Sequence, residues 1–110
     1  MGSESPDSIR GISDYLREEF DLDKEDVEEM LDEFIKNINS LVQTGKEQIE
    51  KSSWEDLKRT GHSVKGAAAN IGANFISKAG KQLEEHALSA NKSECELFVE
   101  QIAKGLDCLR

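Results

Sequence analysis

The chain has 110 residues, and its 23 acidic and 14 basic side chains give a formal net charge of −9. This length fits one domain and excludes a multi-domain enzyme, and the acidic balance argues against nucleic acid or an anionic membrane as a partner. With 36% apolar residues and one proline, the composition favours long helices around one core. No apolar stretch reaches the roughly 20 residues of a membrane span, and the N-terminus lacks the apolar run of a signal peptide, so we expect a cytoplasmic protein.

Residues 7 to 20 carry the first helical pattern. Ser5 is the candidate N-cap and Pro6 the candidate first helical residue, because proline is favoured at that position. The apolar residues of this segment recur on one helical face: Ile9, Ile12, Leu16 and Phe20. The segment is short, so we expect residues 1–22 to form a cap that packs on one end of the core.

A longer helix is predicted to begin at Asp23, an N-cap residue followed by a second acidic residue, Asp26, three positions on. It is predicted to fade beyond Gly45 and to end near Lys51. Its apolar residues follow a helical rhythm: Val27, Leu31, Phe34, Ile38 and Leu41. This regular apolar face is typical of a helix in a bundle.

The third helix is predicted from the capping-box spacing of Ser52 and Glu55, which places its start near Ser53. It is predicted to run to about Gly72, because a glycine can adopt the left-handed conformation that ends helices.

Two more helices complete the pattern. Asn74 is the predicted N-cap of the fourth, which ends near Ala90, and Ser93 is predicted to open the fifth. The inward residues of these two helices are Ile76, Ala79, Leu83 and Ala87, followed by Cys95, Phe98, Val99, Ile102, Leu106 and Leu109. Amphipathic helices joined by short connections must bury their apolar faces together. We therefore predict a single all-α domain over residues 1–110, with an antiparallel four-helix bundle over 23–110 and the N-terminal helix packed on one end.

The third helix has an unusual outer face. Its inward residues fall within one narrow arc: Leu57, Gly61, Val64, Ala68 and Ile71. His62 lies about 140° from the middle of that arc, so it is expected to face solvent. Gly66 follows one turn later and costs about 1 kcal/mol relative to alanine in a helix interior. A glycine there leaves the imidazole uncovered.

Charge and small side chains support a site at this histidine. From Leu57 to Leu83 the chain has no acidic residue and five basic ones. A neutral imidazole offers one unprotonated nitrogen as a nucleophile. No carboxylate lies within a turn of His62 to complete a hydrolase triad, whereas Lys65 is placed to neutralise a phosphoryl group. The alternative interpretation is a plain solvated histidine on a good helix.

The segment from Gly61 to Ala73, GHSVKGAAANIGA, resembles the signature of histidine-containing phosphotransfer (HPt) domains. The match consists of the histidine, an aliphatic residue two positions on, Lys-Gly, two small residues and then aliphatic-Gly. The flanking Trp54, Leu57 and Gln82-Leu83-Glu84 are similar to the family pattern. Gly61 departs from it, because an alanine more usually precedes the histidine.

The resemblance implies a non-enzymatic phosphocarrier in a His-Asp phosphorelay. His62 would accept a phosphoryl group from a receiver-domain aspartyl phosphate and pass it to an aspartate of another receiver. Lys65 would assist electrostatically, Gly66 would give access, and Glu84 would hydrogen-bond the imidazole. The implied partners are receiver domains of response regulators and of a hybrid sensor kinase, with Mg²⁺ on the receiver and no cofactor or metal on this chain, which we expect to be a monomer.

A docking surface for these partners is expected around His62. Its predicted members are Lys58, Gly66, Ala69, Ala73, Lys78 and Lys81. The lysines would steer acidic receiver pockets toward a protein that is otherwise negative. The alternative function is a helical adaptor that binds a partner through the same Ala/Gly surface without phosphotransfer.

The remaining candidate ligands are predicted to be structural. His86 is expected at the edge of the core rather than in a second site. Cys95 and Cys108 would lie about 20 Å apart along one helix, too far for a disulfide. Neither the histidines nor the cysteines have the spacing of a zinc site.

Overall fold

The computed structural model describes residues 6–109 of the chain. Over these residues the chain forms helices and no strand, so the prediction of an all-α fold is confirmed. The elements in chain order are α1 (Ile9–Phe20), α2 (Lys24–Glu50), α3 (Trp54–Asn70), α4 (Asn74–Leu88) and α5 (Lys92–Asp107).

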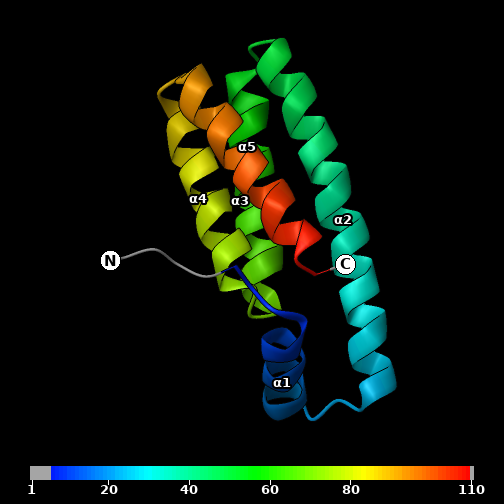
Figure 1. Cartoon of the computed structure of the whole chain (residues 1–110). Helices are drawn as coiled ribbons and strands as arrows, with labels where there is room; N and C mark the ends of the chain where they lie inside the picture. Colours follow the sequence, from blue (N-terminus) through cyan, green and yellow to red (C-terminus); the bar gives the residue numbers. More distant parts are fainter. Residues whose placement is uncertain (1–5, 110) are drawn as a thin grey trace.

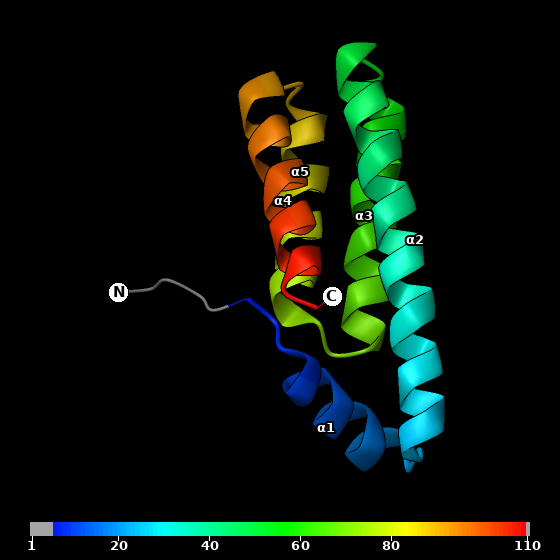
Figure 2. The same ribbon diagram turned by 45° about the vertical axis from the view of Figure 1, so that its right-hand side comes forward.

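The helices α2 to α5 lie side by side, and successive helices run in opposite directions (Figure 1). The short helix α1 lies beyond the end of this group, near the turn that joins α3 to α4, and leads into the start of α2 (Figures 1 and 2). The most extensive contact between two helices is that of α3 with α4, followed by that of α4 with α5. The pairing of α3 with α4 brings together the helices that carry the candidate site.

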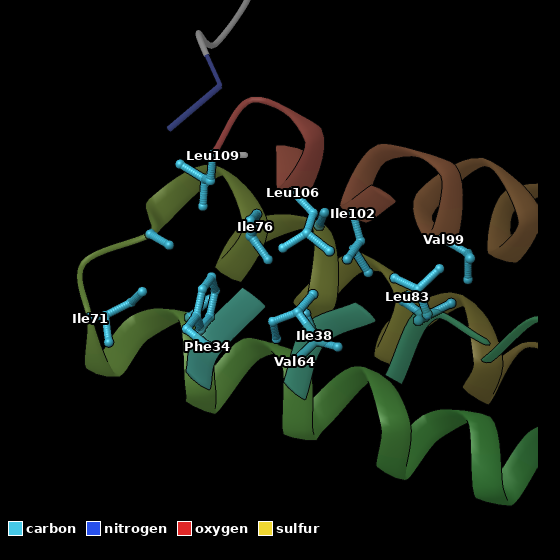
Figure 3. Close-up of a cluster of buried hydrophobic side chains, with 14 of the residues drawn as sticks. Phe34, Ile38, Val64, Ile71, Ile76, Leu83, Val99, Ile102, Leu106 and Leu109 are labelled. Atoms are coloured by element: carbon cyan, nitrogen blue, oxygen red, sulfur yellow. The ribbon is translucent and has the colours of Figure 1, made fainter. Parts of the chain in front are cut away.

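The core lies between the facing sides of α2, α3, α4 and α5 (Figure 3). All predicted inward residues of α3 and α4 are buried, which confirms those two faces. In α2 the buried face continues through Val42, Gly45 and Ile49, whereas Leu41 is half-buried and packs against the core from its edge. Strict alternation of four and three averages about 3.5 residues, slightly less than the helical repeat of 3.6, so a second step of four, from Ile38 to Val42, keeps the later residues on the inward side.

The apolar face of α1 is only partly covered. Ile12 and Leu16 are buried, but Ile9 and Phe20 at the two ends of the helix are 44% and 49% exposed. The predicted four-residue inward face is therefore reduced to two residues. No helix of residues 6–109 is long and apolar enough to cross a membrane.

Helix starts follow local capping at three places. The Asp23 carboxylate accepts a hydrogen bond of 2.9 Å from the backbone nitrogen of Asp26, as the sequence predicts. The helix α1 begins at Ile9 rather than residue 7, because the Ser8 hydroxyl caps it by accepting from Gly11 nitrogen. Ser5, the predicted cap, lies outside the described residues, and Pro6 precedes the helix.

The fifth helix also starts earlier than predicted. Asn91 caps it, with its side-chain oxygen accepting from Glu94 nitrogen at 3.2 Å, so Ser93 is already inside the helix.

The predicted capping box at the start of α3 is wrong. Ser52 has a left-handed backbone with φ of 54°, and its nitrogen donates to the carbonyl of Ile49. Ser53 nitrogen donates to the carbonyl of Gln48, and Ser53 stands before α3 without a side-chain cap. Ser52 therefore terminates α2 rather than starting the next helix, since a left-handed residue satisfies the last carbonyls of the helix before it.

The cap of α4 comes from a distant part of the chain. Asn74 is the first residue of α4 rather than its N-cap, and the methyl side chain of Ala73 in the cap position cannot accept a hydrogen bond. Instead, the Asp7 carboxylate accepts hydrogen bonds from Phe75 nitrogen at 2.9 Å and from Ile76 nitrogen at 3.1 Å. This contact ties the segment before α1 to the end of α4 next to the α3–α4 turn.

Candidate functional site

His62 lies in the middle of α3 with 67% of its side chain exposed. The residues before and two positions after it, Gly61 and Val64, are buried, so the helix turns its apolar side to the core and the imidazole outward. The exposed imidazole stands on a helix that is anchored by extensive contact with α4. This combination gives a nucleophile that is both accessible and held in place.

Glu84 of α4 contacts two residues of α3 at once. Its Oε2 atom lies 3.3 Å from Nδ1 of His62, and its Oε1 atom lies 3.2 Å from Nζ of Lys65. The Glu84 side chain is only 22% exposed, whereas that of Lys65 is 35% exposed. The site is therefore a three-residue cluster in which one partly buried carboxylate links the imidazole to the ammonium group.

The charge of Glu84 is stabilised by these neighbours. Burial by itself raises the pKa of the Glu84 carboxyl. The hydrogen bond and positive charge of Lys65, together with the contact to His62, outweigh that effect and hold the pKa below its ordinary value. Glu84 is consequently a carboxylate at neutral pH and can accept a hydrogen bond from an N–H group of each partner.

The position of Glu84 selects one tautomer of His62. A carboxylate facing Nδ1 favours the hydrogen on that nitrogen, since the hydrogen bond made by one ring nitrogen sets the state of the other. We assign the hydrogen to Nδ1 on this ground. The lone pair is then on Nε2, the ring nitrogen opposite the Glu84 contact.

The surface beside the imidazole is open at Gly66. A Cβ atom built on this glycine meets no atom of the described residues within 4 Å, so packing inside the molecule does not require a glycine here. The residue is exposed in the same way as Ala69, one turn further along α3. A glycine that internal packing does not need is consistent with a requirement set from outside the chain.

The other predicted docking residues do not all reach this surface. Lys58 is half-buried with its Nζ 3.5 Å from Glu55, and Lys78 and Lys81 are exposed on α4. Ala73 is fully buried, so its predicted place on the docking surface is wrong. The chain turns out of the helix at Gly72, whose φ is 76°, and this turn carries Ala73 inward at the start of α4.

Sequence reasoning missed two residues of α4 that hold the site together. The Ser77 hydroxyl donates to the backbone carbonyl of Lys65 at 3.0 Å, and Gly80 lies directly against α3. Ser77, Gly80 and Glu84 recur at spacings of three and four, which places them on one helical face. That pattern of small residues ending in a carboxylate is the signal that could have identified them.

The departure of Gly61 from the family pattern has a structural reason. A Cβ atom on Gly61 would lie 2.7 Å from the backbone nitrogen of Glu84. An alanine therefore does not fit before His62 at the present separation of α3 and α4.

His86 and the cysteines lie outside the cluster. The His86 ring stacks on that of Phe98 with centroids 5.4 Å apart, and its Nε2 is 4.0 Å from Glu94. The half-buried His86 thus sits at the α4–α5 boundary, as predicted. Cys95 is buried and Cys108 exposed, and both are free thiols, which confirms that they form no disulfide. Burial is the main cause that raises the pKa of the Cys95 thiol.

Residues 6–109 contain no candidate metal site. No group of three or more His, Cys, Asp or Glu side chains in that range is arranged to hold a metal ion.

Comparison with known families identifies the chain. The family model of the Hpt domain matches residues 29–110, from the first third of α2 to the last residue, so the chain belongs to the Hpt domain family. The matched range includes all three residues of the cluster. No curated protein and no solved structure shows a significant match to the chain. Hpt domains are helical phosphocarrier modules, and membership implies phosphotransfer in a His-Asp phosphorelay through interaction with receiver domains.

Proposed function

We propose that this chain accepts a phosphoryl group on His62 from the aspartyl phosphate of one receiver domain and passes it to an aspartate of another. The observation that carries the proposal is the exposed imidazole whose Nδ1 is held 3.3 Å from Glu84, in a chain of the Hpt family. The chain supplies a nucleophile and its orientation, and it acts as a carrier without an autonomous catalytic reaction.

The proposed transfer starts from the lone pair on Nε2 of His62. This lone pair attacks the phosphorus atom in line with the bond to the receiver aspartate. The N–P bond forms as the P–O bond breaks, and the electron pair of that bond stays on the aspartate carboxylate. Nδ1 keeps its hydrogen, so the imidazole becomes positively charged beside the Glu84 carboxylate. The reverse sequence delivers the group to the second receiver.

Lys65 is proposed to neutralise the phosphoryl oxygens. Its side chain is partly exposed and contacts Glu84 on the same side of α3 as His62. As the negative phosphoryl group approaches, the ammonium group gains a second anionic partner. Glu84 is at the same time drawn to the imidazolium, so the three charges remain paired through the transfer.

The proposed partners are receiver domains of response regulators and of a hybrid sensor kinase. Their acidic pockets would carry the Mg²⁺ that assists the reaction, and this chain would bind no metal or cofactor of its own. Lys78 and Lys81, which are exposed on α4, would steer the encounter together with Lys58. We further propose a cytoplasmic monomer without nucleic-acid or membrane partners, in which residues 1–22 form a cap and residues 23–110 the phosphotransfer bundle.

The proposal is tested by incubating the protein with a phosphorylated receiver domain and Mg²⁺. A phosphohistidine gives an acid-labile, base-stable label, which should be present in the parent and absent in His62→Gln. A matched control is His86→Gln, which changes the half-buried histidine at the α4–α5 boundary and should keep the label. Receiver binding without any covalent label would instead support the adaptor function.

A further inference from the structure

The helices α3 and α4 touch through two glycines. A Cβ atom on Gly61 would lie 2.7 Å from Glu84 nitrogen and 2.9 Å from Gly80 oxygen. A Cβ atom on Gly80 would lie 2.7 Å from Lys65 nitrogen and 3.0 Å from Gly61 oxygen. The nearest atom in each case belongs to the backbone, and Cγ1 of Val64 would also lie 2.9 Å from the Cβ atom on Gly80. Movement of a side chain alone therefore cannot relieve these contacts. The two helices therefore cross with their backbones in direct contact.

The atoms in this contact belong to the residues of the candidate site. Gly61 touches the backbone of Glu84, and Gly80 touches the backbone of Lys65. The side chains of the same two residues meet at 3.2 Å, while His62 is the immediate neighbour of Gly61 along α3. Any increase in the separation of the helices at the glycines thus moves the carboxylate of Glu84 away from both of its partners.

We propose that Gly61 and Gly80 are positioning residues for phosphotransfer, because their backbone contact sets the separation at which Glu84 reaches His62 and Lys65 together. This inference rests on the proposed function of His62 as the phosphoryl acceptor. Glycine is disfavoured inside helices, so two glycines facing each other across a helix crossing need a reason of this kind. The two glycines contribute by setting the separation of the helices. They make no contact with the phosphoryl group.

The first test variant is Gly80→Ala, which adds one methyl group at the crossing, and Gly61→Ala adds it from the other helix. Gly45→Ala is the matched control, because a Cβ there meets its nearest neighbour, Val99, at an ordinary contact distance of 3.6 Å.

The first readout is the pKa of the Glu84 carboxyl, measured by carbon NMR in the unphosphorylated protein. The positive groups that lower this pKa are Lys65 and His62 on α3. Gly80→Ala and Gly61→Ala should raise it toward its ordinary value, whereas Gly45→Ala should leave it unchanged. This measurement needs no phosphoryl donor. It therefore fails or succeeds independently of the proposed function.

The second readout is the single-turnover transfer rate at saturating phosphorylated receiver. Gly80→Ala should slow transfer by roughly 10-fold, a loss within the range caused by small misplacements of catalytic groups. The control Gly45→Ala should transfer at the parent rate. In a Glu84→Ala background, Gly80→Ala should cause no further loss, because the side chain that the glycine positions is gone.

Two results would overturn the inference. One is an unchanged pKa of Glu84 in a folded Gly80→Ala or Gly61→Ala protein, and the other is a raised pKa with transfer at the parent rate. If neither alanine variant folds, Glu84→Asp is tested instead, because its shorter side chain increases the distance from the carboxylate to His62 and Lys65. Transfer at the parent rate by Glu84→Asp would also overturn the inference. A different outcome is that the alanine variants raise the pKa of Glu84 but the parent protein takes no phosphoryl label. That result would support the positioning of Glu84 by the glycines and would reject the proposed function.

Discussion

Glu84 faces His62 across the contact of two helices, with its Oε2 atom 3.3 Å from the imidazole Nδ1. The sequence from Leu57 to Leu83 contains no acidic residue, and Glu84 is the first one after that basic stretch. The Glu84 carboxylate thus follows a basic stretch of sequence and contacts both His62 and Lys65. This relationship defines the chemistry expected of the site.

Replacing His62 by glutamine should abolish phosphoryl acceptance and leave the fold intact. The side chain is largely exposed, so the free energy of unfolding should change by no more than about 0.5 kcal/mol. Circular dichroism and thermal unfolding test the stability, and labelling by a phosphorylated receiver tests the chemistry. Retained label in His62→Gln would contradict the assignment of the acceptor.

Lys65→Ala should reduce the transfer rate even at saturating receiver. The loss should correspond to about 1 to 3 kcal/mol of transition-state stabilisation, the scale of a hydrogen bond to a charged group. Lys78→Ala should instead be restored by a higher receiver concentration, because that residue acts on encounter. Single-turnover rates measured across receiver concentrations separate the two effects, and equal saturating rates for parent and Lys65→Ala would reduce Lys65 to a docking charge.

Replacing Gly66 by glutamine should separate stability from function. The open space at this position accommodates a side chain, and the loss of a helical glycine should stabilise the protein by up to about 1 kcal/mol. The new side chain would nevertheless obstruct the approach to His62 and slow transfer. Thermal unfolding and transfer rate are measured on the same variant, and a Gly66→Gln protein that melts at a higher temperature and transfers as fast as the parent would show that access is not the role of Gly66.

The contribution of Glu84 to stability should depend on pH. Because its folded-state pKa is lowered, the ionised carboxylate stabilises the fold above the ordinary value of 4.5, and this stabilisation is lost as the pH falls through the lowered pKa. The difference in free energy of unfolding between the parent and Glu84→Gln should therefore shrink below about pH 4.5. Urea unfolding across that range, with the exposed neighbour Glu85→Gln as control, checks the sign. A difference that grows on acidification would contradict the direction of the shift.

Asp7→Ala should destabilise the start of α4 by about 1 kcal/mol, the usual cost of losing an N-cap. Asp7 accepts from two backbone nitrogens of α4, so its loss leaves Phe75 and Ile76 without their partner. Hydrogen exchange at these two amides should accelerate, and thermal unfolding should shift downward. The control is Asp14→Ala, which removes an exposed acidic residue of α1. Equal effects of both variants on stability and hydrogen exchange would show that Asp7 acts through its charge and not as a cap.

Much of the fold followed from local sequence patterns. The all-α class, the cap at Asp23 and the buried faces of α3 and α4 were predicted from periodicity and capping residues, and the structure confirms them. These features depend on residues within one or two turns of each other, whose relation is fixed by helical geometry. The same geometry places His62 outward on α3.

Errors arose where a helix end is decided by a second element. Ser52 has the spacing of a capping box, but its left-handed backbone satisfies the carbonyls at the end of α2. The cap of α4 is supplied by Asp7 rather than by Asn74, because the chain before α1 folds back against the α3–α4 turn. Neither outcome can be deduced from the residues adjacent to the helix end alone.

The sequence by itself determined which residues could carry the chemistry: an uncovered histidine, a lysine three positions on, and a basic surrounding in an acidic chain. Only the tertiary structure decided that Glu84 reaches His62 and Lys65 at the same time. A helical pattern gives the direction of a side chain around its own axis, but it contains no information on the distance to another helix. Here that distance is set by Gly61 and Gly80, whose backbones meet only once α3 and α4 have packed.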